Sequence, residues 1–205
     1  MSKTSREFER LWSEQEDISL LGKFMFKVDR RKIFSLLEYA DLTPKSTVLD
    51  VGCGTGNTLK LIRGLGYENS IGCDVAESSI RLCEKNGLER NKDVFLEDIV
   101  KSSWKRDFDL VFSEGSIEHY NKIQPIVDGI CKASRKYVLT CMPNLESQYW
   151  VLFEMTLKMM GRKHAKDYNH SEDEYLKAFK KAGFKLVKMK MFSFNRGWIM
   201  LFKRC

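Results

Sequence analysis

Hydrophobic and polar positions follow two alternating patterns from residue 29 to the end of the chain. Short apolar runs typical of buried strands are separated by segments in which apolar residues recur at helical spacing. The runs predict strands at residues 47–51, 70–74, 94–96, 108–112, 137–142, 184–192 and 198–202. The helical spacings predict helices around Ile33–Ala40, Leu59–Leu65, Ile80–Cys83, Ile123–Ile130 and Leu176–Phe179, and a weak one ending near Trp104.

This regular alternation predicts an α/β fold with a doubly wound sheet of seven strands and helices on both faces. Most consecutive strands are separated by a helix, so the sheet should be mostly parallel. The last two runs are instead joined through Asn195–Gly197, with no helix between them. The last strand is therefore expected to be antiparallel.

Composition limits the class of protein. The chain has 205 residues, a net charge of +7 and 43% hydrophobic residues, which fits one globular domain over 1–205. No apolar run reaches the ~18 residues that span a bilayer, because Glu154 and Lys158 interrupt the longest one, 149–160. The six cysteines contain no CxxC pair, and the acidic N-terminal residues do not form a targeting segment. We therefore expect reduced thiols and a cytoplasmic location.

The strongest local signal is the glycine loop, Asp50-Val51-Gly52-Cys53-Gly54-Thr55-Gly56-Asn57, placed where the first strand turns into a helix. Glycines there let the backbone approach a ligand, and the following helix directs N–H groups at it. Asn57 stands where a dinucleotide fingerprint requires its third glycine. The carboxylate of Asp50 beside the loop suits a cation better than a pyrophosphate.

This combination resembles the first motif of the class I S-adenosylmethionine-dependent methyltransferases, and the resemblance extends from about residue 29 to 205. It implies a Rossmann-like sheet, with S-adenosyl-L-methionine as cofactor and S-adenosyl-L-homocysteine as product. The family places an acid that takes both ribose hydroxyls at Asp74, and one that accepts from the adenine amino group at Asp98. The implied cofactor-binding residues are Asp50, Gly52, Cys53, Gly54, Gly56, Asn57, Asp74, Val75, Ser78, Asp98, Ile99, Ser113 and Glu114. The alternative is that each acid caps the next helix.

The loop after the fourth strand supplies the candidate catalytic residues, His119 and Glu118. An imidazole titrates near neutral pH and can act as a base. The form Ser113-x-Gly115-x-x-Glu118-His119 resembles the corresponding loop of cyclopropane fatty-acid synthases, and some phosphobase methyltransferases similarly use a histidine there. The alternative is that both residues hydrogen-bond locally. His164 and His170 are expected at the surface, and no spacing predicts a metal site.

The resemblance implies a methyltransferase that acts on a small molecule by in-line displacement. Two segments are expected to form the acceptor pocket: a helical extension or lid at 1–28, and an inserted helical segment at 145–170. The apolar stretch in the second segment could instead be core or contact a membrane surface. The net charge of +7 keeps an RNA or protein acceptor open, as does a module that binds the cofactor without catalysis. The sequence does not indicate the oligomeric state.

Overall fold

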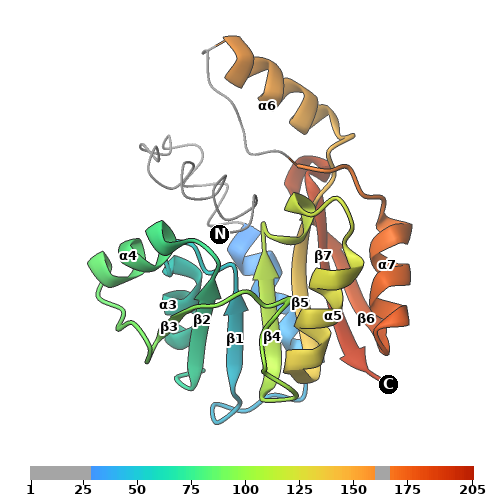
Figure 1. The fold of residues 1–205 in the computed structure, drawn as a ribbon. Coiled ribbons are helices and arrows are strands. Elements are labelled where there is room, and N and C mark those ends of the chain that lie inside the picture. Colours follow the sequence, from blue (N-terminus) through green and yellow to red (C-terminus); the bar gives the residue numbers. More distant parts are fainter. Residues whose placement is uncertain (1–28, 160–166) are drawn as a thin grey trace.

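The computed structural model describes residues 29–159 and 167–205, so the predicted lid at 1–28 lies outside the described residues. One sheet of seven strands forms the centre of the molecule, in the order β3-β2-β1-β4-β5-β7-β6 (Figure 1). The strands are β1 (Val48–Val51), β2 (Ser70–Asp74), β3 (Val94–Leu96), β4 (Phe108–Glu114), β5 (Ser134–Pro143), β6 (Phe184–Met191) and β7 (Gly197–Arg204). The α-helices are α3 (Asn57–Gly64), α4 (Glu77–Lys85), α5 (Gln124–Ala133), α6 (Gln148–Met159) and α7 (Glu172–Lys181).

Strand directions confirm the predicted sheet. Strand β1 pairs in parallel with β2 and β4, β2 pairs in parallel with β3, and β4 with β5. Strand β7 runs antiparallel to both of its neighbours, β5 and β6. The order of the strands reverses between β1 and β4, and ligands of doubly wound sheets bind at the carboxyl ends of the strands around such a switch point.

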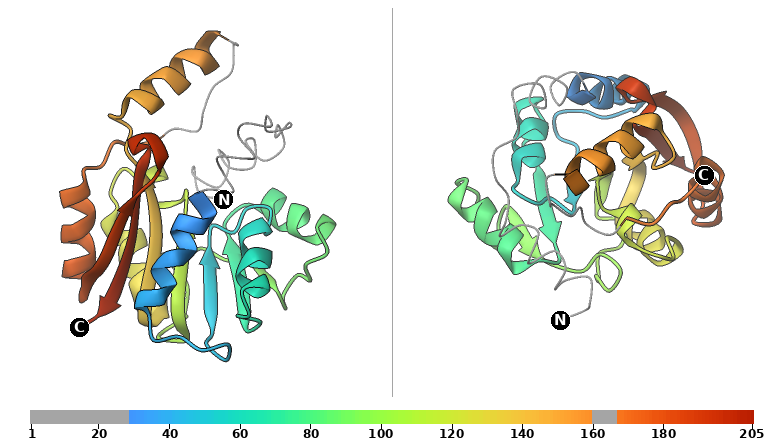
Figure 2. Two further views of the ribbon diagram at one scale, coloured as in Figure 1. Left: turned by 180° about the vertical axis from the view of Figure 1, so that it is seen from behind. Right: turned by 90° about the horizontal axis from the view of Figure 1, so that it is seen from above.

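Helices cover both faces of the sheet, as predicted. Residues 29–34 are helical and continue into a 3₁₀ helix, η1 (Ser35–Tyr39); with α3 they lie on one face, while α5 and α7 lie on the other (Figure 2). Each layer has its own apolar core. Ile33, Leu36 and Ile62 pack against one side of the sheet. On the other side, Ile126 and Phe179 belong to a second cluster, in which Phe179 stacks on Phe202 with ring centroids 4.0 Å apart.

The predicted helix ending near Trp104 is wrong. Residues 97–107 form turns and loop, and the indole of Trp104 packs edge-on against Phe95 and Phe108, with centroids 6.1 and 5.5 Å away. The Trp104 ring is thus packed from a loop and not from the face of a helix. Helix α7 begins with a capping box, in which the hydroxyl of Ser171 accepts from the N–H of Glu174.

Helix α6 is the described helical part of the 145–170 segment, and it projects beyond the carboxyl end of the sheet (Figures 1 and 2). Its base is fixed because the indole N–H of Trp150 donates to the carbonyl of Arg196 at 2.7 Å. Val151, Leu152 and Met155 on the helix are more than half exposed. Its place in an acceptor pocket stays a prediction.

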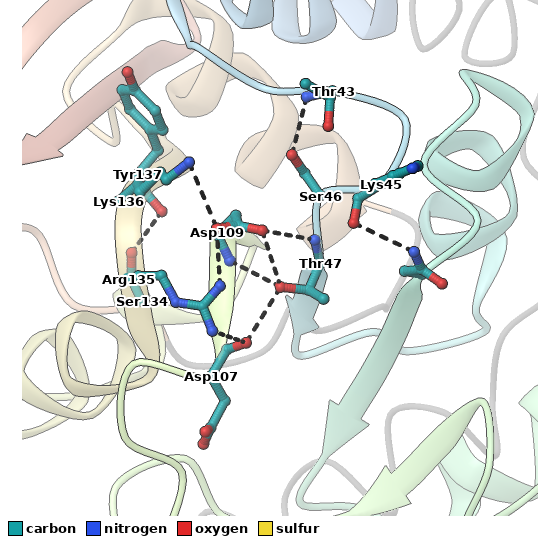
Figure 3. Close-up of polar contacts among 11 residues, drawn as sticks. Thr43, Lys45, Ser46, Thr47, Asp107, Asp109, Ser134, Arg135, Lys136 and Tyr137 are labelled. Carbon is teal, nitrogen blue, oxygen red and sulfur yellow. Dashed lines mark hydrogen bonds and ion pairs between the residues drawn. The ribbon is translucent and has the colours of Figure 1, made fainter.

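A polar cluster fixes the opposite end of the sheet, at the starts of β1, β4 and β5 (Figure 3). The carboxylate of Asp109 accepts from the N–H of Thr47 at 3.1 Å and from Arg135 Nη1 at 3.1 Å. Burial raises the pKa of Asp109, but the N–H of Thr47 and the guanidinium of Arg135 together outweigh burial and hold this pKa below its usual range. The carboxylate therefore stabilises the fold in its ionised form.

Asp109→Asn is expected to lower the free energy of unfolding at neutral pH by about 1–2 kcal/mol, because charge-assisted hydrogen bonds are lost. A carboxyl group whose pKa is lower in the folded protein than in the unfolded chain stabilises the fold at pH values above its unfolded pKa, which is about 4. That contribution disappears as the pH falls through the folded pKa. Urea unfolding should thus show the gap between wild type and variant closing at acidic pH. Asp173→Asn, at a side chain 68% exposed, is the matched control. A gap independent of pH would contradict the assignment.

Candidate functional site

A cavity opens at the carboxyl ends of β1, β2 and β4, with about 490 Å³ of space when its open mouth is counted. This position, at the strand ends around the switch point, is where doubly wound sheets bind small molecules. The cavity wall includes residues of the glycine loop, of β2, of the loop after β4 and of α5. The lining residues are Val51, Gly52, Cys73, Asp74, Val75, Glu97, Ile99, Gly115, Ser116, Tyr120 and Ile126. The predicted residues Gly52, Asp74, Val75 and Ile99 thus meet at one cavity.

The glycine loop takes a conformation that side chains disfavour. Gly52, Gly54 and Gly56 have φ angles of +74°, +54° and +75°. A Cβ atom on Gly52 would also lie 2.0 Å from Ser116 Oγ, in the loop that follows β4. Glycine is therefore required here both for the backbone torsion and for the close approach of two loops at the cavity.

Asp74, at the end of β2, connects the glycine loop to the next helix. Its Oδ2 accepts from the N–H of Gly54 at 3.0 Å, and its Oδ1 accepts from the N–H of Ala76 at 2.9 Å. Burial raises the pKa of Asp74, although these N–H donors lower it. A carboxylate oxygen has more than one lone pair, so Asp74 can accept further hydrogen bonds from a ligand in the cavity.

Two buried oxygens at the ends of β1 and β4 have no hydrogen-bond partner among the residues that the structure describes: Asp50 Oδ2 and Ser113 Oγ. Burial raises the pKa of Asp50 to about 7, against the lowering effect of Arg30. Arg30 also pairs with Glu114, with its Nη1 2.8 Å from Glu114 Oε2. Burial raises the pKa of Glu114 as well. Unsatisfied buried oxygens are costly, so these two indicate a polar or cationic ligand.

After β3 the structure places Glu97 in the cavity wall and leaves Asp98 out of it. Asp98 Oδ1 accepts from the N–H of Val100 at 3.0 Å and so caps a turn, whereas the alternative interpretation expected a helix cap. Sequence reasoning therefore missed Glu97. The role of Asp98 toward an adenine amino group stays a prediction.

Other predicted cofactor residues lie behind the cavity wall. The side chain of Cys53 packs in an apolar cluster with Leu59 and Cys83, and its N–H donates to the carbonyl of Cys73 at 3.0 Å. Gly56 precedes α3, Asn57 is the first residue of α3 and is exposed, and Ser78 lies in the first turn of α4. None of these four residues lines the cavity, and their roles toward the cofactor stay predictions.

The candidate catalytic residues lie on a short 3₁₀ helix after β4, η2 (Ile117–His119). Glu118 is 6% exposed, and burial raises its pKa to about 7, against the lowering effect of His119 and with a raising effect of Asp167. His119 Nδ1 lies 2.9 Å from Asp167 Oδ1, so the imidazole pairs with a carboxylate from the segment after α6. The structure thus joins the predicted histidine to an acid that sequence reasoning missed.

Two further contacts join the same segments. The N–H of Tyr168 donates to the carbonyl of Glu118 at 2.8 Å. His170 Nε2 donates to the carbonyl of Tyr120 at 2.8 Å, since a carbonyl oxygen can only accept. His170 is 8% exposed, so the expected surface position of this residue is wrong. His164 lies outside the described residues.

Tyr120 is a second residue that sequence reasoning missed as part of the site. Its side chain lines the cavity, and burial raises its phenol pKa to about 12, with Asp98 and Asp74 acting in the same direction. The phenol therefore stays protonated and can donate a hydrogen bond to a ligand. Its place directly after His119 in the loop is a signal that could have pointed to it.

Across residues 29–159 and 167–205, the structure contains no group of three or more side chains arranged to hold a metal ion. Over the same residues, no helix has the length and apolar character to cross a bilayer.

The chain is similar to one known protein family, to curated proteins and to solved structures. The family described as the methyltransferase domain matches residues 22–189. The 2-methyl-6-phytyl-1,4-hydroquinone methyltransferase 2 of Oryza sativa subsp. japonica is 30% identical over 159 residues, which are 75% of this chain and 43% of that protein. Ribosomal protein L11 methyltransferase of Thermotoga petrophila is 29% identical over 121 residues, 58% of this chain and 45% of that protein. The chain thus spans less than half the length of these curated relatives.

A solved structure extends the likeness to the fold. The magnesium protoporphyrin IX methyltransferase of Synechocystis PCC 6803, with bound SAH, aligns with a TM-score of 0.68 at 18% identity, covering 99% of this chain and 95% of that chain.

Proposed function

Because the chain belongs to the methyltransferase domain family, whose class I members depend on S-adenosylmethionine, we propose that it transfers a methyl group from that cofactor to a small molecule. The observation that carries the proposal is the cavity at the switch point of the sheet, where Asp74 and the glycine loop meet. The transfer is an in-line displacement, for which the protein must hold the acceptor close and aligned.

The cavity residues fit the cofactor. Asp74 has acceptor capacity for ribose hydroxyls, and the partnerless Oδ2 of buried Asp50 offers negative charge near the loop. Apolar side chains from β1 and α5, Val51 and Ile126, line the cavity beside them. The Tyr120 phenol can donate a hydrogen bond. When bound, the cofactor supplies an electrophilic methyl group on a positively charged sulfur.

Affinity for S-adenosylmethionine is expected to fall as the pH drops through about 7, the pKa to which burial raises Asp50. Protonation below this pH neutralises Asp50, so the cationic cofactor loses a nearby negative charge. Its affinity is expected to fall by up to about tenfold per pH unit. Calorimetric titration one pH unit below and above that value measures the effect. S-adenosylhomocysteine, with its neutral sulfur, should show a weaker dependence, and Asp50→Asn should flatten both. Equal slopes for the two ligands would contradict this role of Asp50.

His119 is the proposed base of the reaction, and Glu118 is the buried acid beside it. An imidazole is suited to take a proton from the acceptor near neutral pH. Glu118, whose pKa burial raises to about 7, provides negative charge next to His119 above that pH. The ion pair between His119 and Asp167 supports an oriented imidazole at the end of β4.

A small-molecule acceptor is supported by relatives whose names state small molecules, a phytyl hydroquinone and magnesium protoporphyrin IX. A protein acceptor is the second candidate, because the Thermotoga relative is named for ribosomal protein L11. The net charge of +7 favours acidic or nucleic-acid acceptors only weakly, since basic residues are scattered along the chain.

The test uses the purified protein with cofactor labelled in the methyl group and a cell extract separated into low-molecular-weight, protein and RNA fractions. Label is expected in the low-molecular-weight fraction. Label confined to the protein or RNA fraction would overturn the acceptor class. Binding of S-adenosylhomocysteine with no transfer to any fraction would instead identify a binding module.

A further inference from the structure

The most exposed apolar side chains of the described residues gather at one end of the molecule. The apolar rim, as we name it, consists of Val151, Leu152, Met155 and Met159 on α6 and Phe194 in the turn between β6 and β7. These side chains are 53% to 87% exposed, more than any other large apolar side chain that the structure describes. Both elements lie at the carboxyl end of the sheet, since β7 begins where Gly197 pairs with Pro143, the last residue of β5 (Figure 1). The cavity opens at the same end.

On α6 the rim residues form a continuous stripe. Val151, Met155 and Met159 recur at every fourth position, and residues at this spacing lie on one face of a helix. The opposite face carries Trp150, whose indole N–H donates to the carbonyl of Arg196 and so attaches α6 to the protein. The stripe therefore faces away from the contact that anchors the helix.

The turn that carries Phe194 is held in place by contacts with the first described helix. Its backbone has a φ of +61° at Phe194, in the left-handed region that bulky residues rarely occupy. The N–H of Ser193 donates to Asp29 Oδ1 at 3.5 Å, and the Asp29 carboxylate also pairs with the guanidinium of Arg196. A strained torsion persists only where the surrounding contacts over-determine it. These contacts hold an aromatic ring in solvent, which packing of the described chain does not explain.

Basic side chains flank the apolar rim. Lys158 is exposed in the last turn of α6. Beside the turn, Lys32 Nζ donates to Ser193 Oγ at 3.1 Å, and the neighbouring Arg31 is exposed. Glu154 is the exposed acid of α6. The flanks of the rim thus carry more positive than negative charge, as does the whole chain with its net charge of +7.

We propose that α6 and the turn between β6 and β7 bind the surface of an anionic lipid bilayer, with the apolar rim among the lipids and its basic flanks at the headgroups. Apolar side chains bordered by lysine and arginine are the features of interfacial binding. A protein partner would need a surface complementary in shape to two separate projections, whereas fluid lipids accommodate each of them.

The same surface indicates the class of acceptor, and this part of the inference rests on the proposed function. The cavity opens at the end of the sheet that carries the apolar rim. A molecule held in the bilayer can therefore reach the cavity with its polar end while its apolar portion stays in the lipid. The acceptor is an amphiphile, and the atom that receives the methyl group belongs to its polar end.

Co-sedimentation of the full chain with vesicles tests the binding surface. Vesicles of phosphatidylcholine mixed with anionic phosphatidylglycerol are compared with vesicles of phosphatidylcholine alone. Binding to the anionic vesicles should be stronger by about fivefold for each basic group near the surface, and added salt should weaken it. Equal binding to the two kinds of vesicle, or binding to neither, would overturn the proposal.

Two apolar variants locate the contact. Phe194→Asn removes the ring and supplies a residue that tolerates the left-handed torsion, and Leu152→Ser interrupts the stripe on α6. Each should weaken vesicle binding about tenfold or more, because a large apolar side chain is removed from the lipid. Leu65→Ser, where α3 ends, is the matched control, since Leu65 is 52% exposed and lies outside the rim. Wild-type binding by both rim variants would contradict the inference.

A charge reversal separates local contact from net charge. Lys158→Glu should weaken binding to the anionic vesicles about fivefold or more and leave binding to neutral vesicles unchanged. Lys45→Glu changes the net charge equally, at an exposed position before β1, and should have a smaller effect. Equal effects of the two substitutions would mean that the basic flank of the rim is not the contact.

Two other occupants of the apolar rim give different results. If the rim joined two copies of the chain, light scattering would show self-association without lipid, and Leu152→Ser would abolish it. If residues 1–28 covered the rim, the full chain would not bind vesicles, and Leu152→Ser would lower the free energy of unfolding in urea. Either result would overturn the proposal.

The acceptor class has its own test. Cofactor labelled in the methyl group is incubated with the protein and a cell extract, which is then partitioned between organic solvent and water. Label is expected in the organic phase, and less of it with Phe194→Asn. Label confined to water-soluble small molecules would overturn the amphiphilic acceptor while the proposed function stands. If no methyl group is transferred to any fraction, the proposed function fails, and vesicle binding still decides the role of the rim.

Discussion

Asp74→Ala is expected to abolish measurable binding of S-adenosylmethionine. The substitution removes a carboxylate that lines the cavity and also removes the acceptor for the N–H groups of Gly54 and Ala76. Loss of the two hydrogen bonds expected from the ribose hydroxyls to this carboxylate costs about 3 kcal/mol or more, which is at least about a 100-fold loss of affinity. Calorimetric titration with the cofactor and with S-adenosylhomocysteine measures it.

Two comparison variants separate ligand contact from folding. Asp74→Asn keeps one carbonyl oxygen, so it should bind more weakly than the wild type and more tightly than Asp74→Ala. Asp109→Asn removes a buried carboxylate at the opposite end of the sheet and should lower stability without changing affinity. Unchanged affinity in a folded Asp74→Ala protein would remove Asp74 from the binding site.

His119→Gln is expected to lower the turnover of methyl transfer by about 100-fold or more, because a positioned base contributes that much. Glutamine keeps a polar side chain beside Asp167 but cannot take up a proton, so the substitution removes the proton acceptor. Transfer of labelled methyl groups to the low-molecular-weight fraction measures the rate.

Cofactor affinity is the internal control for this substitution, because His119 does not line the cavity. S-adenosylhomocysteine should bind the variant and the wild type within about twofold, so that the loss appears in turnover alone. Equal turnover in the two proteins would leave His119 with a structural role only, which is the alternative that the sequence already allowed.

The sequence predicted those parts of the site that local order determines. The glycine loop, Asp50 and Asp74 follow strands directly, and the carboxyl ends of neighbouring parallel strands meet at one edge of the sheet. The strand directions were predictable as well. Parallel strands need a long crossover connection, which a helix supplies, whereas β6 and β7 are joined by a short connection without an α-helix and run antiparallel.

Long-range contacts could not be predicted in this way. Nothing in the residues around Asp167 or His170 indicates that they return to the loop at 118–120. The turn after β3 likewise decides that Glu97 faces the cavity while Asp98 caps the turn. Trp104 suggested a helix, whereas its ring is accommodated in a loop between two other aromatic rings. In each case tertiary packing determines the role of the side chain.

A crystal structure of the protein with S-adenosylhomocysteine is the decisive measurement. We expect the adenosyl group in the cavity beside Tyr120, with both ribose hydroxyls donating to the Asp74 carboxylate. The sulfur is expected near the ends of β1 and β4, on the side of Asp50. Electron density for the ligand anywhere else, or Asp50 and Asp74 turned away from it, would rule out this binding site.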